Sequence, residues 1–121
     1  MTPLMTTSDS LRYAPGDIIV VPFPYSDQFA EKRRPALVVS NSKVQSQGYI
    51  WVVMITSALH SRLKNDLEID DLVQAGLTSR SIVRPVKITN IEPARVIRRA
   101  GRLKAEQATV VFDVVKSFIG R

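Results

Sequence analysis

Apolar residues in this chain fall mostly into short runs that are typical of β-strands. The β-branched run 18–21 follows a Gly-Asp turn and ends at the Pro-Phe-Pro segment 22–24, which predicts a first strand. The run 49–56 is apolar on both alternating faces and therefore indicates a central strand buried on both sides. Pro85 lacks an amide hydrogen, so its strand is expected to lie at an edge or to contain a bulge. Together the patterns predict strands at 18–21, 35–40, 49–56, 67–69, 81–88 and 94–97.

A helical period appears only near the end of the chain. Apolar residues recur there at steps of three and four positions, as in an amphipathic helix packed on a sheet: Ala108, Val111, Phe112, Val115 and Ile119. Many short strands with one terminal helix predict a mainly β fold, a small and strongly curved antiparallel barrel with one C-terminal α-helix.

The same patterns suggest how the chain is organised. Residues 1–15 show neither period and are expected to form a disordered leader, whereas 16–121 are expected to form a single domain around one core. The polar segment 25–34 predicts a loop longer than a simple hairpin needs, and long loops on small domains often carry function. The N-terminus lacks the features of a secretory signal, and no apolar run approaches about 18 residues. A cytoplasmic location without membrane association is therefore expected.

The charge of the chain narrows the choice of partners. Its net charge is +6, and the part from Arg80 onward holds ten basic residues against three acidic ones. This excess favours a polyanionic partner, although a basic surface also serves solubility alone.

The chain has no cysteine, which excludes disulfides and thiolate nucleophiles. It shows no histidine and aspartate cluster with metal-ligand spacing, so neither a metal nor another cofactor is expected.

Two residues stand where chemistry could occur. Arg34 lies at the predicted junction of the basic loop and the second strand, where its planar guanidinium could bind a phosphate, although such a residue is usually a solvated turn. Thr56 ends the most buried strand and could present its hydroxyl at the rim of the sheet, although threonine is also simply a good strand residue. His60 is interpreted as a surface residue rather than an acid or base, and the acidic residues of 66–71 as a solvated turn.

Taken in order, several segments resemble the MazF/PemK family of toxin endoribonucleases. The resemblance spans 16–120 and rests on the segments GDIIVVPFPYSD, KRRPALVVSN, VVMITSALHS, AGLTSRSIVRPVKI and GRLKAEQ. It implies an SH3-like barrel of the MazF/PemK/CcdB toxin type, acting as a homodimer. It also implies metal-independent cleavage of single-stranded RNA at short sequence motifs. A cognate antitoxin would neutralise the protein by laying its tail across the RNA groove, and DNA would be contacted only through that antitoxin.

The resemblance also implies roles for particular residues. In such enzymes an arginine that opens the RPA segment and a threonine that ends the third long strand are the paired catalytic residues, and they correspond here to Arg34 and Thr56. Arg33 is the neighbouring candidate if the register shifts by one, and Ser57 is a possible second hydroxyl. We hypothesise that the 2′-hydroxyl beside the scissile phosphate attacks in line, with Arg34 stabilising the developing charge and Thr56 holding the phosphate.

Further residues are expected to bind the RNA. Arg84 and Lys87 would track its backbone, and Phe23 or Tyr25 would stack on bases. Some relatives follow the arginine at the position of Arg84 with an aspartate base two residues later, but Val86 stands there in this chain. That difference argues against a carboxylate base at this position.

Two other functions are compatible with the same barrel. One is a binding toxin that poisons a topoisomerase through its C-terminal helix, but such a protein has no need of Arg34 and Thr56 at the rim. The other is a DNA-binding module that uses the basic C-terminal part, which predicts steep salt dependence without cleavage.

Overall fold

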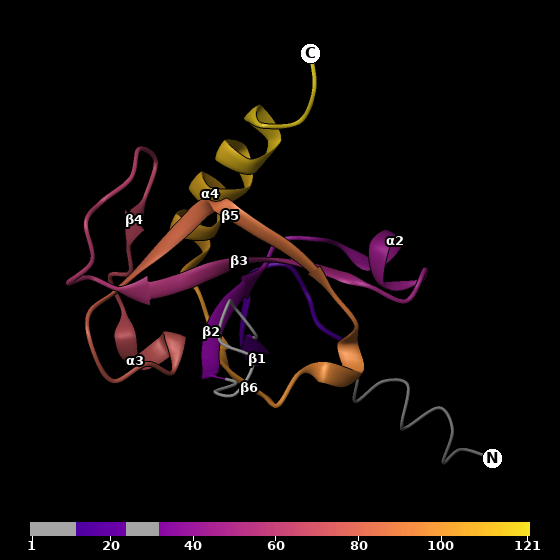
Figure 1. The fold of residues 1–121 in the computed structure, drawn as a ribbon, viewed down its shortest axis with the longest axis horizontal. Coiled ribbons are helices and arrows are strands. Elements are labelled where there is room, and N and C mark those ends of the chain that lie inside the picture. The colour runs from indigo at the N-terminus through magenta and orange to yellow at the C-terminus, as the bar shows by residue number, and fades with distance from the viewer. Residues whose placement is uncertain (1–11, 24–31) are drawn as a thin grey trace.

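The computed structural model describes residues 12–23 and 32–121 (Figure 1). One antiparallel sheet of six strands, in the order β4-β5-β3-β2-β1-β6, dominates the fold. Its strands are β1 (Asp17–Phe23), β2 (Lys32–Val38), β3 (Ile50–Ser57), β4 (Leu67–Glu68), β5 (Ser81–Ile91) and β6 (Arg98–Arg102). The helical elements are α2 (Ser42–Gln45), α3 (Leu72–Ala75), the 3₁₀ turn η1 (Pro93–Arg95) and α4 (Ala105–Ser117). The sheet curls into a half-barrel with one long C-terminal helix, which confirms the predicted fold class.

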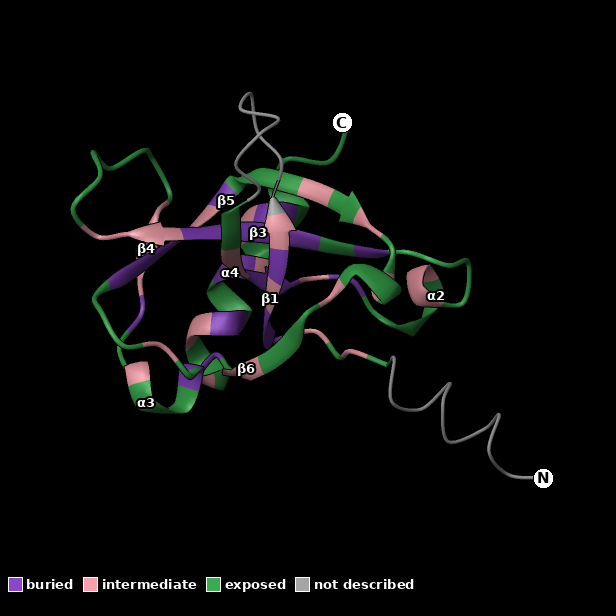
Figure 2. Ribbon diagram, turned by 60° about the horizontal axis from the view of Figure 1, so that its bottom comes forward, coloured by how far each residue is buried: buried purple, intermediate pink, exposed green. Residues whose placement is uncertain are grey.

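The curled sheet separates two hydrophobic clusters. Ile18, Leu37 and Val53 belong to an outer cluster that also contains Val111 of α4. Their sequence neighbours Ile19, Ala36 and Val52 belong to an inner cluster on the other face of the sheet, together with Met54. Figure 2 shows the buried stretches along β1 and β3. The central position of β3 and its burial on both faces are thus confirmed.

A bulge in β5 changes the register of its pairing with β3. Met54 pairs with Arg84, whereas the preceding residue Val53 pairs with Ile88, so 85–87 are extra residues in β5. Pro85 lies in this irregular stretch and is buried. The sequence predicted either an edge strand or a bulge at Pro85. The bulge is confirmed, and the edge position is wrong because β5 lies between β3 and β4.

The second strand begins earlier than the sequence predicted. The ladder with β1 continues through Val21↔Arg34 to Phe23↔Lys32, so Arg34 lies inside β2 rather than at a junction with a loop. Backbone pairing does not require apolar side chains, which is why the charged residues Lys32 and Arg33 did not reveal this extension.

The predicted strand 94–97 is wrong. Pro93 begins the 3₁₀ turn η1 there, and β6 starts only at Arg98. The sequence of β6, RRAGR, has no apolar alternation, and the strand is held by pairing with β1 at the edge of the sheet. The C-terminal helix also ends earlier than its apolar period suggested, and Ile119 lies beyond its end and is exposed.

The predicted leader and loop fall largely outside the described residues, which omit 1–11 and 24–31. The described part of the leader starts at Arg12, and Tyr13 packs against the inner cluster. The Tyr13 amide also donates a hydrogen bond to Gln45 Oε1. None of the helices in the described part of the chain is long and apolar enough to cross a membrane.

Candidate active site

Three neighbouring strands bring cationic and hydroxyl groups to one face of the sheet. Met54 of β3 pairs with Ala36 of β2 on one side and with Arg84 of β5 on the other. Arg34 lies two residues from Ala36, and Thr56 lies two residues from Met54. Because side chains alternate along a strand, Arg34, Thr56 and Arg84 share the face that carries the inner cluster.

A cavity of about 340 Å³ opens where these residues meet. It is lined by Arg34, Met54, Ile55, Thr56, His60, Arg84 and Lys87. Arg34 Nε is buried and has no hydrogen-bond partner among the described residues. An unpaired buried donor costs about 1–3 kcal/mol, so this N–H group is suited to an acceptor supplied by a ligand.

His60 reaches the same cavity through a tight turn after β3. The Leu59 amide donates to Ser57 Oγ at 3.1 Å and the His60 amide donates to the Ser57 carbonyl at 3.1 Å, which reverses the chain. The imidazole Nδ1 then lies 2.7 Å from Thr56 Oγ1. His60 was not expected from the sequence to belong to the site. A serine directly after Thr56, which can form such a turn, was the available signal.

Arg84 lines the cavity but is bound to a buried carboxylate. Its Nη2 donates to Asp66 Oδ2 at 2.9 Å and to the Ser61 carbonyl at 2.6 Å, and the Asp66 side chain is 1% exposed. Burial by itself raises the pKa of Asp66, but hydrogen bonds from Arg84 and the Leu63 amide, with nearby positive charge, outweigh it and lower the pKa. This ion pair fixes the segment 61–66 to β5 beside the cavity.

Only some of the other predicted site residues lie at the cavity. Lys87, the last residue of the bulge in β5, lines the cavity. Arg33 is exposed and alternates to the other face of β2, and Ser57 is occupied in the turn and does not line the cavity. Phe23 ends β1, but its side chain and the whole of Tyr25 lie outside the described residues.

The acidic residues of 66–71 have separate partners. Glu68 accepts hydrogen bonds from Arg80 at 2.7 Å and from Arg62 at 2.8 Å. The hydrogen bond from Arg80 lowers the pKa of Glu68, partial burial opposes this effect, and the bond from Arg62 adds to the lowering. Asp71 caps α3 by accepting a hydrogen bond from the Gln74 amide.

The Asp66–Arg84 ion pair predicts a pH-dependent contribution to stability. Because the pKa of Asp66 is lowered by folding, the contribution is present above the ordinary pKa range of aspartate and is lost as the pH falls through the lowered value. We expect Asp66→Asn to reduce the free energy of unfolding by about 2 kcal/mol at neutral pH, since it leaves Arg84 without its counter-ion. Urea denaturation at neutral and strongly acidic pH measures this difference, which should shrink in acid.

Asp70→Asn is the matched control for this prediction. Asp70 Oδ2 lies 4.0 Å from Lys104 Nζ and its side chain is 62% exposed, so the change should stay below about 0.5 kcal/mol. Equal losses in the two variants would contradict the assigned role of the buried pair.

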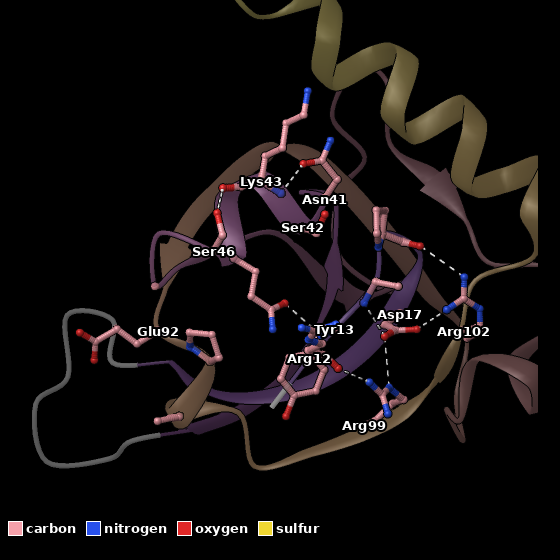
Figure 3. Close-up of a pocket in the computed structure, with 16 residues that line it drawn as sticks. Arg12, Tyr13, Asp17, Asn41, Ser42, Lys43, Ser46, Glu92, Arg99 and Arg102 are labelled. Atoms are coloured by element: carbon pink, nitrogen blue, oxygen red, sulfur yellow. Dashed lines mark hydrogen bonds and ion pairs between the residues drawn. The ribbon is translucent and has the colours of Figure 1, made fainter. Parts of the chain in front are cut away.

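A second and larger hollow lies between the N-terminal described residues, α2, η1 and β6 (Figure 3). Asp17, which is buried, accepts hydrogen bonds from Arg99, Arg102 and the Ala14 amide. The guanidinium of Arg99 also lies over the Tyr13 ring, 5.0 Å from its centroid. The charged groups of this cluster are paired with one another. We therefore interpret the cluster as a set of ion pairs and hydrogen bonds that attaches residues 12–17 to the edge strand β6.

The fold and the smaller cavity define a class of protein, in which a curled antiparallel sheet with a C-terminal helix carries a cationic pocket on its inner face. The sequence matches the profile of the PemK-like, MazF-like toxins of type II toxin-antitoxin systems over residues 14–119. The chain belongs to this family. Among curated protein sequences, none matches the chain.

Solved structures of toxins share the fold at low sequence identity. MazF from Deinococcus radiodurans superposes with a TM-score of 0.70 at 18% identity, covering 90% of this chain and 97% of that one. The toxin MazF-mt6 from Mycobacterium tuberculosis superposes with a TM-score of 0.65 at 20% identity, covering 84% and 93%. An endoribonuclease in complex with its cognate antitoxin from a mycobacterial species superposes with a TM-score of 0.67 at 12% identity, covering 91% and 100%.

Proposed function

We propose that this toxin is an endoribonuclease that cleaves single-stranded RNA at specific sequences without a metal ion. The observation that carries the proposal is that Arg34 Nε, buried and without a partner among the described residues, belongs to the residues that line the same cavity as Thr56. A guanidinium whose N–H group still needs an acceptor, beside an alcohol and further cations, is suited to bind one phosphodiester group. The similarity of the fold to a mycobacterial endoribonuclease supports the same assignment.

The proposed reaction uses a nucleophile that RNA itself supplies. The 2′-hydroxyl attacks the adjacent phosphorus in line, and the products are a cyclic phosphate and a free 5′-hydroxyl end. Arg34 stabilises the charge on the phosphate oxygens, and Thr56 donates a hydrogen bond that holds the phosphate. A cavity of about 340 Å³ can accept the phosphate and its sugar, provided the strand is unpaired and splayed out.

Substrate binding would extend from this cavity along the sheet. Lys87 and Arg84 contribute positive charge to the RNA backbone, with Arg84 held in place by Asp66. Phe23 and Tyr25 are the candidates for stacking on bases, Arg33 would add charge at the rim of β2, and Ser57 would keep the turn that carries His60.

The proposed partners follow from the family and from the exposed surface. One similar structure holds an endoribonuclease with its cognate antitoxin, and a cognate antitoxin is the expected inhibitor here, through which alone DNA would be contacted. A homodimer would cover Trp51 and Ile88, which lie on one face of β3 and β5 and are 40% and 45% exposed. As an enzyme acting on messenger RNA, the protein would work in the cytoplasm.

Incubation of the purified protein with a long unstructured RNA in the presence of EDTA tests the proposal. We expect discrete cuts at one short motif, with 2′,3′-cyclic phosphate and 5′-hydroxyl ends, as mapped by end-specific ligation and sequencing. Intact RNA across many sequences would contradict the proposal and favour a protein that only binds its target.

A further inference from the structure

The proposed reaction requires a group that accepts the proton of the 2′-hydroxyl. Among the described residues that line the cavity, arginine and lysine are hydrogen-bond donors without an acceptor, and an alcohol is a poor base. The nearest described carboxylate bound to this wall, Asp66, is engaged with Arg84 and almost fully buried. His60 is the one lining residue whose type exchanges a proton in the neutral range.

The contact with Thr56 orients the imidazole ring and leaves its second nitrogen toward a ligand only in one tautomer. Nδ1 lies 2.7 Å from Thr56 Oγ1, and Nε2 has no hydrogen-bond partner among the described residues. If Nδ1 carries the proton and donates it to Oγ1, the lone pair of Nε2 is available to a substrate. The hydroxyl hydrogen of Thr56 is then also free to donate to a phosphate oxygen. The tautomer protonated on Nδ1 therefore leaves both the lone pair of Nε2 and the hydroxyl hydrogen of Thr56 available to the substrate.

We propose that His60 is a catalytic residue and acts as the general base, an inference that rests on the ribonuclease function proposed above. Nε2 of His60 takes the proton of the 2′-hydroxyl while the 2′-oxygen forms its bond to phosphorus. The bond from phosphorus to the 5′-oxygen breaks, and its electron pair stays on that oxygen, which takes a proton from water. The imidazolium then returns its proton to water, so the enzyme is restored.

Three of the residues that line the cavity with His60 are cationic. Arg34 belongs to β2, Arg84 and Lys87 belong to β5, and the further basic residues Arg62 and Lys64 follow His60 in its loop. Asp66 faces Arg84, with which it forms an ion pair. These cations hold an anionic phosphate beside the base without competing for the proton of the 2′-hydroxyl.

The first test compares His60→Asn with the wild-type protein on an RNA that contains the mapped site. Asparagine keeps a donor near the position of Nδ1 but has no proton-accepting nitrogen, so cleavage should fall by about 10²-fold or more. The wild-type rate should rise with pH, because the neutral imidazole is the active form, and His60→Asn should lose this rise. Leu59→Ala is the matched control, because Leu59 is 94% exposed and does not line the cavity.

The outcomes separate this inference from the function on which it rests. If His60→Asn cleaves at the wild-type rate while Arg34→Ala does not cleave, the role of His60 is overturned and the ribonuclease function stands. The role of His60 is also overturned, and the ribonuclease function stands, if His60→Asn keeps the rise of the rate with pH while Asp27→Asn or Glu31→Gln loses it. Both of these acidic residues lie in the segment outside the described residues. If the wild-type protein leaves RNA intact, both proposals fail.

A second test distinguishes a base from an acid. In a substrate with sulfur in place of the bridging 5′-oxygen, the leaving group needs no proton, so an acid becomes dispensable. We expect the defect of His60→Asn to persist on this substrate, and full recovery would overturn the role as base.

A third measurement does not depend on activity. His60 is the only histidine of the chain, so the imidazole nitrogens of untagged protein give a single set of NMR signals. We expect the neutral ring to carry its proton on Nδ1, and Thr56→Val to change that preference. A ring protonated on Nε2 in the wild-type protein would overturn the proposed tautomer.

Discussion

Arg34→Ala is expected to reduce RNA cleavage by about 10³-fold, the loss typical of removing one donor that stabilises charge in a transition state. The structure places the guanidinium in the cavity with Nε buried and unpaired among the described residues, so its hydrogen-bonding capacity is reserved for a ligand. Arg34→Lys should recover little activity, because an ammonium group cannot reproduce the planar fork. Initial rates on a short oligonucleotide that contains the mapped site measure both variants.

Arg33→Ala provides the control for this prediction. Arg33 has the same charge and the adjacent position, but it is exposed and lies on the other face of β2. Its loss should change the rate by only a few-fold, through the weaker attraction of RNA to the surface. Arg34→Ala should unfold at a temperature no lower than the wild type, because it removes a buried donor that has no partner in the described part of the chain. Equal effects of the two substitutions on cleavage would contradict the assignment of Arg34.

Gly76→Ala is expected to produce the largest loss of stability, about 3 kcal/mol or more. Gly76 ends α3 with a φ of 76°, and a Cβ there would stand 2.0 Å from the carbonyl oxygen of Ala100 in β6. The obstacle is backbone of another element, so α3 and β6 must separate to admit a methyl group. The free energy of unfolding from urea denaturation of the full chain measures the loss.

Gly48→Ala separates the effect of backbone conformation from that of packing. Gly48 has a φ of 95°, but a Cβ at this position would meet no atom within 4 Å, so alanine should cost only about 1–2 kcal/mol of conformational strain. The difference between the two variants therefore reports the close approach of α3 to β6. Similar losses would contradict that interpretation.

Much of the fold could be predicted because the pattern of apolar residues along the chain matches the burial of those residues in the folded protein. The run 18–21 is β-branched and the run 49–56 is apolar on both faces, and they became β1 and β3 between the two clusters. The helical period of Ala108, Val111 and Val115 became the buried side of α4 for the same reason. Pro85 indicated either an edge strand or a bulge, because it lacks an amide hydrogen, and the bulge is the one that formed.

The site was predictable only in part. Resemblance to a family selected Arg34 and Thr56, and the structure places both at one cavity. The hydrogen bond of His60 to Thr56 depends on the turn through Ser57, and the partnership of Asp66 with Arg84 joins residues 18 positions apart. Neither contact leaves a periodic signal in the sequence.

The order of apolar and polar residues by itself determined the class of fold, the central strand and the terminal helix, because burial of apolar surface is the largest favourable contribution and acts on every residue of a strand or helix. Tertiary structure alone decided that the charged segment RRAGR forms β6, that Arg34 rather than Arg33 faces the cavity, and that His60 joins Thr56 there. These features depend on strand register and on single polar contacts between separate segments, and neither produces a periodic pattern of apolar residues in the sequence.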